Sequence, residues 1–271
     1  MESFISSDDL RINLWNLAVN DVSYNIVDIK PPNMDELNEV ITCAEFNPIS
    51  SSQFAYSTSK GSVRLSDLRM SALCDTPIRA FYEEEDPSTK SFFSEIISSI
   101  SDIKFTRDGK YILARDYLTL KVAISIVFLV SIYLQIWDTA MDKAPVKVFN
   151  IHEHLRSKLC DLYENDCIFD KFECDSSSDG KQFVTGSYHR YLRVFNADPS
   201  TNEVVLQANR LQPKPVKKAG DKQGRKKDKK DVFEEVNPDN IDYTKKTTHL
   251  AFHPDDNLIA ASVQNNLFIF T

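Results

Sequence analysis

A repeated order of short apolar segments constrains the fold of this chain more than any other feature of its sequence. Each repeat closes on an apolar segment that ends in an aromatic residue or Ser, usually followed by Asp or Asn. These closing segments lie at 11–16, 63–67, 136–138, 192–196 and 267–270. Before each of the last four, the same elements follow one another: a Phe, a polar or Pro-containing turn, an apolar strand and a small or polar turn.

This repetition predicts an all-β chain built from similar antiparallel units. Turns containing Asp-Gly, Asn-Pro or Lys-Gly separate the short strands within the units. Each unit holds about three strands, and a linker can supply a fourth, which is typical of a WD-repeat β-propeller. An irregular β-sandwich is the alternative, but it does not explain why turns and strands recur in one order.

The units are longer than the ~40–45 residues usual for this class, and the excess lies in three linkers. The first linker covers 68–100, and the second covers 139–170 with a predicted helix at 151–162. The third, 209–231, is rich in Lys and Arg. A nuclear-import signal or a phosphate-binding patch would use such a run, but we favour a solvated flexible loop.

One segment, 122–135, carries no charged residue and reads VAISIVFLVSIYLQ. A membrane-spanning helix needs roughly 20 apolar residues. This run is shorter, and Lys121 and Asp138 flank it closely. The sequence therefore predicts no membrane partner.

No group of residues in the sequence indicates catalysis. It contains no P-loop, no G-x-S-x-G motif and no nucleophile with an adjacent base. His152 and His154 are two positions apart, so they do not share a helix face and do not predict a metal site. The five cysteines include no C-x-x-C pair. We therefore expect no enzyme activity, no metal and no cofactor.

The charge balance and the cysteines limit partners and location. The formal net charge of −8 argues against a nucleic-acid partner, which would require a basic surface. An odd number of cysteines favours reduced thiols. Residues 1–4 have neither a basic nor an apolar stretch, so no signal peptide is predicted. We expect a cytoplasmic protein, with the nucleus as a second location.

The stretch 162–170 mixes aromatic residues with carboxylates between two repeats. Loops on a rigid scaffold often carry recognition residues. A structural crossover that only packs Ile168 and Phe169 explains the same composition, so the residues alone leave both interpretations open.

Three long strings carry a family resemblance: 7–15 (SDDLRINLW), 92–102 (FFSEIISSISD) and 162–174 (LYENDCIFDKFEC). All three closely resemble the fifty-five-kilodalton regulatory B subunit of protein phosphatase 2A. The resemblance runs from residue 2 to the C-terminus, apart from 122–135.

The resemblance implies a seven-bladed, non-catalytic propeller. Such a protein joins a scaffold subunit and a catalytic subunit in a heterotrimer. It selects phosphoprotein substrates with basic flanks through an acidic groove on its top face. The positions that match the family's substrate-contacting residues are Asp9, Leu10, Tyr163, Asp166 and Phe169. Carboxylates attract basic residues, and Tyr and Phe offer rigid apolar contact.

The chain departs from this family at its start. The match begins after the first blades and the hairpin arm that would hold the scaffold. We therefore expect 1–271 to form a single partial propeller, with about four of seven blades and the last strand of another. The alternative function is a truncated interaction scaffold that no longer binds the phosphatase.

The second departure is the apolar segment. The family runs directly from the equivalent of Lys121 to that of Ile136, so 122–135 adds fourteen residues. The segment begins with Val, whose codons start with GT, and ends with Gln, which CAG encodes. Our hypothesis is a retained in-frame intron. A cDNA read across the Lys121 codon tests it, and the fourteen codons in the main transcript would disprove it.

Overall fold

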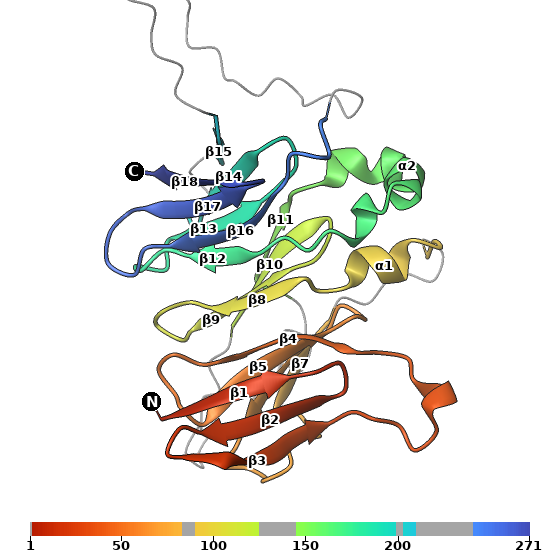
Figure 1. The fold of residues 1–271 in the computed structure, drawn as a ribbon, viewed down its shortest axis with the longest axis vertical. Coiled ribbons are helices and arrows are strands. Elements are labelled where there is room, and N and C mark those ends of the chain that lie inside the picture. Colours follow the sequence, from red (N-terminus) through yellow and green to blue (C-terminus); the bar gives the residue numbers. More distant parts are fainter. Residues whose placement is uncertain (1, 83–89, 125–144, 199–202, 210–240) are drawn as a thin grey trace, which may run out of the picture.

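The computed structural model describes residues 2–82, 90–124, 145–198, 203–209 and 241–271, and these residues form five antiparallel sheets (Figure 1). The sheets are β1 (Ser3–Ser7), β2 (Arg11–Asn16) and β3 (Val19–Asp28); β4 (Ile41–Phe46), β5 (Gln53–Thr58), β6 (Val63–Asp67) and β7 (Arg79–Phe81); β8 (Asp102–Phe105), β9 (Tyr111–Arg115), β10 (Thr119–Ile124) and β11 (Lys147–Asn150); β12 (Cys174–Ser176), β13 (Gln182–Gly186), β14 (Tyr191–Asn196) and β15 (Val204–Gln207); and β16 (Thr247–Phe252), β17 (Ile259–Val263) and β18 (Asn266–Phe270).

The sheets follow one another in chain order, and the first strand of each contacts the first strand of the next (Figure 1). This arrangement confirms the predicted partial β-propeller. The structure differs from the sequence prediction at the N-terminus, where three strands form a sheet although the sequence predicts only one. The segments 136–138, most of 209–231 and most of 122–135 lie outside the described residues.

Short helical segments occupy the linkers. They are the 3-10 helices η1 (Met34–Glu36), η2 (Glu153–Lys158) and η3 (Cys167–Phe169) and the α-helices α1 (Ser94–Ser98) and α2 (Leu159–Glu164). The helix predicted at 151–162 is therefore present two residues further on, as η2 followed by α2. Within the described ranges, no helix combines the length and the apolar character needed to cross a bilayer.

Two turns show that the sequence repeat is also a structural repeat. In the β8–β9 turn, the Thr106 hydroxyl and the Lys110 amide both donate to the Asp108 carboxylate. Ser177, Lys181 and Asp179 form the same pair of hydrogen bonds in the β12–β13 turn. The glycine that follows each aspartate has a positive φ, which favours glycine over other residues.

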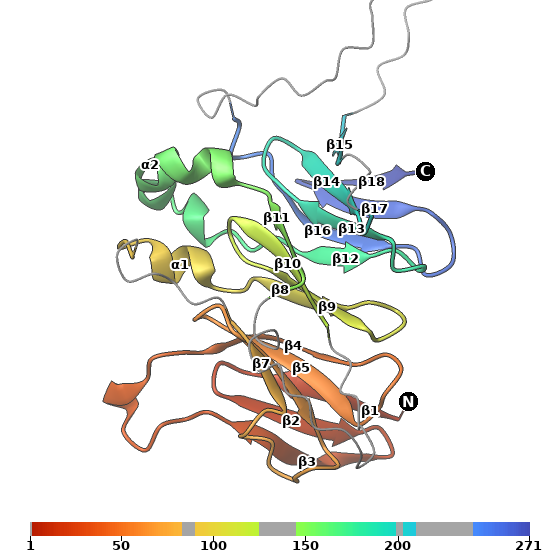
Figure 2. The same ribbon diagram turned by 180° about the vertical axis from the view of Figure 1, so that it is seen from behind.

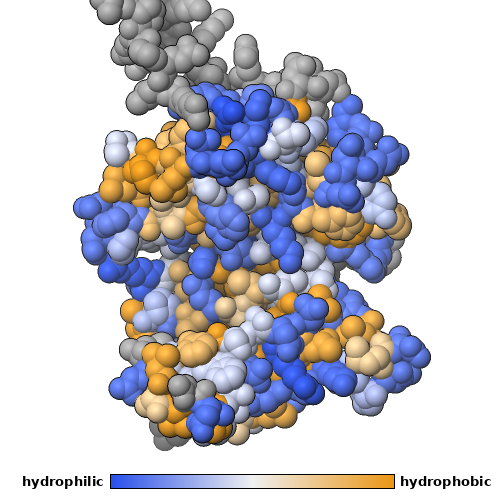
Figure 3. All heavy atoms as spheres, viewed as in Figure 1, coloured by the Kyte–Doolittle hydropathy of each residue, from blue (hydrophilic) through white to orange (hydrophobic). Residues whose placement is uncertain are grey.

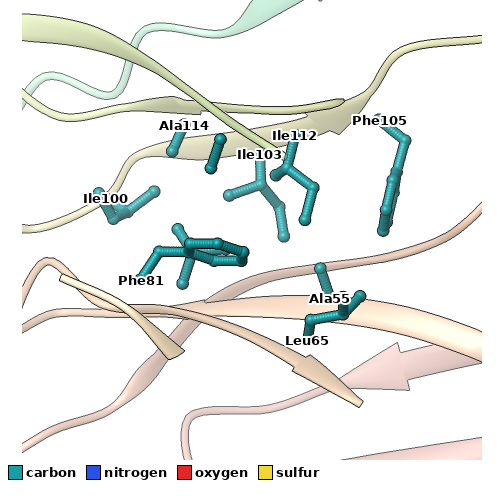
Figure 4. Packing of buried hydrophobic residues seen from close by; sticks show 10 residues of the cluster. Ala55, Leu65, Phe81, Ile100, Ile103, Phe105, Ile112 and Ala114 are labelled. Carbon is teal, nitrogen blue, oxygen red and sulfur yellow. The ribbon is translucent and has the colours of Figure 1, made fainter. Parts of the chain in front are cut away.

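The hydrophobic core is divided among the interfaces between sheets. Between the second and third sheets, Leu65 and Phe81 face Ile100, Ile103 and Ile112 (Figure 4). Ile100 precedes β8, and alternate residues of the strands supply the other side chains, as the period of two along a strand requires. Burial of apolar surface therefore holds each sheet to its neighbour.

Carboxylates on the inner strands link the sheets through hydrogen bonds to backbone amides. Glu45 on β4 accepts from Phe105 N on β8 at 2.9 Å, and Asp102 on β8 accepts from Cys174 N on β12 at 2.9 Å. Next to and on β12, Glu173 accepts from Leu250 N at 3.1 Å and Asp175 accepts from Phe252 N at 2.7 Å, both amides lying on β16. Edge amides that the sheet ladders leave unpaired therefore gain acceptors.

The two end sheets carry apolar side chains on their outer faces. On β18, Phe268 and Phe270 pack inward, whereas Leu267 and Ile269 are exposed. Figure 3 shows the resulting hydrophobic patch over β17 and β18. On the first sheet, the exposed Phe4 stacks on Trp15, with 6.1 Å between the ring centroids.

The apolar segment 122–135 begins inside a strand. Val122, Ala123 and Ile124 complete β10, opposite Leu113, Ile112 and Tyr111 of β9. Ala123 borders a small cavity. Its lining also includes Gly61, Val63, Phe81, Tyr82, Ile100 and Ala114.

We predict that deleting 122–135 stabilises the protein. The deletion joins Lys121 to Ile136, so Ile136, Trp137 and Asp138 would take the β10 positions of Val122, Ala123 and Ile124. The indole of Trp137 would then replace the Ala123 methyl group at the edge of this cavity and add apolar contact beside Phe81 and Ile100. The expected result is a higher melting temperature by calorimetry and a larger soluble yield by size-exclusion chromatography.

The matched control combines this deletion with Trp137→Ala. Loss of a buried Trp side chain costs about 3 kcal/mol, so this control should lose most of the gain. Equal melting temperatures for the deletion and its Trp137→Ala version would show that the indole does not enter the cavity.

A second prediction concerns pH. Burial raises the pKa of Glu45 to about 6, the nearby Asp102 and Asp175 carboxylates act in the same direction, and Lys104 opposes them. The folded state therefore binds this proton more tightly than the unfolded chain, whose glutamate has a pKa of 4.5. This contribution to stability is fully present below pH 4.5 and disappears as the pH rises through about 6.

Glu45→Gln removes the titration and retains an acceptor for the Phe105 amide. We expect the free energy of unfolding of the native protein, measured relative to this variant by denaturant titration, to be larger at pH 4.5 than at neutral pH. Glu95→Gln, at an exposed carboxylate, is the control and should show no such trend. A pH-independent difference for Glu45→Gln would contradict the prediction.

Candidate recognition surface

Asp9 and Leu10 lie in the turn between β1 and β2. The Asp8 carboxylate holds this turn by accepting from Leu10 N at 2.8 Å and Arg11 N at 2.7 Å. The carbonyl oxygen of Asp9 accepts from Ile41 N of the second sheet at 2.8 Å. The backbone is therefore fixed, while the Asp9 side chain is exposed and Leu10 is half-buried.

Tyr163, Asp166 and Phe169 lie together on α2, η3 and the residues between them. The Tyr163 and Phe169 rings are 5.9 Å apart and are 40% and 53% exposed. Asp166 is exposed and has a φ of 57°, in the left-handed region that aspartate tolerates better than most residues. This conformation turns the chain sharply between the two helical segments.

The residues next to these three are buried and explain their exposure. Leu162 and Ile168 are both 2% exposed and belong to one cluster with Leu159. Tyr163 and Phe169 follow them directly and point outward. The crossover interpretation of 162–170 is therefore correct for Ile168, whereas Phe169 remains largely accessible.

Two further aromatic residues join this surface. Phe92 and Phe93 precede α1, and their ring centroids lie 5.6 Å and 5.9 Å from that of Tyr163. Phe92 is 72% exposed. We call Phe92, Phe93, Tyr163 and Phe169 the aromatic cluster. Sequence reasoning used 92–102 only for the family resemblance, although an adjacent Phe pair in a polar linker was an available signal.

The two groups of predicted residues come from distant sheets. Figures 1 and 2 show the β1–β2 turn, α1 and α2 on the same side of the molecule, with the turn lying apart from the helices. Exposed carboxylates accompany the aromatic cluster, at Glu95 on α1, at Glu164 on α2 and at Asp166. This side can therefore offer negative charge beside flat apolar surface.

His152, one of the two histidines considered for a metal, is fully buried. Its Nδ1 lies 2.9 Å from the Tyr117 carbonyl oxygen and its Nε2 lies 2.9 Å from Ser187 Oγ. The carbonyl can only accept and favours a proton on Nδ1, whereas the Arg115 guanidinium, whose Nη2 lies 3.3 Å from the same Nδ1, can only donate. The Ser187 hydroxyl can donate to Nε2 or accept from it. Burial and the neighbouring Arg115 lower the pKa of His152. Among the described residues, no group of three or more His, Cys, Asp and Glu side chains could hold a metal ion.

Structural comparison defines the class of protein. The β-propeller domain of Cps50 (Swd1) from Myceliophteria thermophila has a TM-score of 0.59 at 12% identity, covering 99% of this chain and 66% of that chain. Chaetomium thermophilum Raptor has a TM-score of 0.55 at 13% identity, covering 97% and 18%. The fold is that of a WD-repeat β-propeller. No family model matches the sequence.

Curated sequences identify the relatives. The phosphatase 2A regulatory subunit phr2AB of Dictyostelium discoideum is 53% identical over 272 residues, covering 99% of this chain and 53% of the relative. The regulatory B subunit of protein phosphatase PP2A from Schizosaccharomyces pombe is 49% identical, covering 100% and 59%. The fifty-five-kilodalton B beta isoform of Carassius auratus is 49% identical, covering 99% and 57%.

These comparisons confirm the resemblance. Along its length the chain is related to the fifty-five-kilodalton regulatory B subunits of protein phosphatase 2A, which are named as regulatory subunits. The chain spans about half the length of the curated relatives that it matches.

Proposed function

We propose that this protein is a substrate-specificity subunit of a type 2A Ser/Thr phosphatase. In this proposal it is not itself an enzyme, and it joins the scaffold and catalytic subunits in a heterotrimer. It recruits phosphoproteins whose phosphosites have basic flanks. Its free cysteines agree with a reducing compartment, so the proposal includes a cytoplasmic location, with the nucleus as a second one.

The aromatic cluster beside Asp166 is the observation that carries this proposal. Tyr163 contacts the rings of Phe92, Phe93 and Phe169, and the four rings form a patch at the edge of a buried cluster that includes Leu162 and Ile168. Aromatic side chains lose little conformational entropy on binding, so they are effective contacts for a peptide. The adjacent carboxylates favour lysine or arginine on that peptide.

Each of the proposed residues has a distinct role. Tyr163 and Phe169 supply contact area, Asp166 attracts a basic residue, and Asp9 and Leu10 extend the contact across the same side of the molecule. The protein needs no reacting group, because the catalytic subunit would supply the chemistry. Recruitment raises the local concentration of the substrate beside that catalytic partner.

The second candidate function is a propeller scaffold without phosphatase binding. The observation behind this second candidate is length, since the chain spans about half of each relative. A pull-down with purified scaffold and catalytic subunits distinguishes the two. Co-purification of both subunits supports the proposal, and their absence supports the scaffold.

We predict that Asp166→Lys weakens the binding of a synthetic phosphopeptide with lysines on both sides of its phosphoserine. The substitution replaces attraction by repulsion, and we expect Kd to rise about tenfold at low salt. The increase should shrink at high salt, where exposed charges are screened. Fluorescence anisotropy with the assembled heterotrimer at two salt concentrations is the measurement.

Two variants complete this experiment. Asp21→Lys, on the exposed surface of β3, is the charge-matched control and should leave Kd unchanged. Phe169→Ala should weaken binding by a similar amount at both salt concentrations, because it removes contact area and no charge. If Asp166→Lys binds as well as the native protein at low salt, Asp166 does not belong to the site.

A further inference from the structure

A buried tyrosine hydroxyl lies directly beneath η3. Tyr188 belongs to the turn between β13 and β14 and is 2% exposed. Its Oη lies 2.7 Å from the Cys167 carbonyl oxygen, 3.1 Å from Asp170 Oδ2 and 3.0 Å from Tyr117 Oη. Lys246, just before β16, pairs with the other oxygen of Asp170.

The direction of these hydrogen bonds follows from the atoms present. The Cys167 carbonyl can only accept, so Tyr188 donates its single proton there, with the Asp170 carboxylate as a longer second acceptor. Tyr117 then donates to Tyr188. Burial raises the pKa of both tyrosines, so both hydroxyls remain protonated donors.

The contacted groups bracket Phe169. The 3-10 helix η3 is a single turn, closed by Asp170 N donating to the Cys167 carbonyl at 3.1 Å. One turn contributes little stability of its own. Tyr188 therefore contacts both ends of the turn that directs Ile168 inward and Phe169 outward.

The ring and the hydroxyl of Tyr188 have separable roles. The ring packs against Phe172 and Tyr243, each with a centroid distance of 5.1 Å, inside the cluster that supports α2. Phenylalanine would keep this packing. The hydroxyl alone reaches the backbone of η3, so Tyr188→Phe tests its contribution without opening a cavity.

We propose that Tyr188 is a positioning residue for the recognition surface, whose hydroxyl holds η3 so that Phe169 and Asp166 present the geometry that a substrate peptide binds. This inference rests on the proposed function. It assigns a role to a residue that touches no substrate. This residue lies in the β13–β14 turn, outside the exposed helical segments α2 and η3.

The test uses the assembled heterotrimer and the phosphopeptide with lysine flanks. We expect Tyr188→Phe to raise Kd about fivefold, the effect of one net hydrogen bond. The melting temperature should fall by a few degrees at most, and hydrolysis of p-nitrophenyl phosphate should be unchanged. Tyr56→Phe, at a fully buried tyrosine of β5, is the matched control and should leave Kd unchanged.

A double-mutant cycle distinguishes positioning from a general structural role. If Tyr188 acts through Phe169, Tyr188→Phe should have no further effect on Kd in a Phe169→Ala background. Additive effects would overturn the inference, as would an unchanged Kd for Tyr188→Phe when Phe169→Ala is impaired. If Phe169→Ala and Asp166→Lys both bind normally, the proposed site itself is wrong.

Asp170→Asn provides a second variant should Tyr188→Phe fail to fold. It keeps the shape of the side chain and weakens the pair with Lys246. We expect a smaller rise in Kd than for Tyr188→Phe, because Tyr188 keeps its shorter hydrogen bond to the Cys167 carbonyl, and no further effect in the Phe169→Ala background. A rise in Kd for Asp170→Asn that persists in full in the Phe169→Ala background would also overturn the inference.

Discussion

Amides on the inner strand of one sheet find their acceptors on the sheet before it, and the remaining structure depends on this constraint. The inner strands approach each other without forming a ladder between sheets. Glu45 and Asp102 instead reach across to Phe105 N and Cys174 N. A buried amide left without an acceptor costs about 1–3 kcal/mol, so these carboxylates fix the sheets relative to one another. The linkers that carry α1, α2 and η3 connect these sheets, so the spacing of the sheets also sets the spacing of these helical segments.

The recognition surface shows how the fold converts adjacent residues into opposite environments. Within α2 and η3, the pairs Leu162–Tyr163 and Ile168–Phe169 each place one side chain inside and the next outside. The inner residues anchor the segment, and the outer ones are exposed beside them. Under the proposed function, a segment held in this way from beneath by the β13–β14 turn would bind a peptide at low entropic cost.

The sequence repeat was sufficient to predict the strands at 11–16 and 63–67, since alternation and turn residues are local signals. The predicted residues Tyr163, Asp166 and Phe169 also lie together. Contact between Phe92 and Tyr163 was not predictable, because it depends on how segments some seventy residues apart pack on one core. The first sheet was underestimated because Ser3–Ser7 is short, has Ser at three of its five positions, and does not show the Phe–turn–strand–turn order of the other units.

The strand β10 shows how little the hydrogen-bond ladder of a sheet depends on its side chains. Its pairing with β9 continues through Val122, Ala123 and Ile124, because ladder hydrogen bonds are made by the backbone and are indifferent to side-chain identity. What distinguishes one sequence from another at this position is the volume that Ala123 leaves beside Phe81. A change of sequence that begins in the middle of a strand therefore leaves the local backbone pairing unchanged. If 122–135 is an insertion, as hypothesised, its cost therefore falls on the packing of β10 against the neighbouring sheet and not on the backbone ladder.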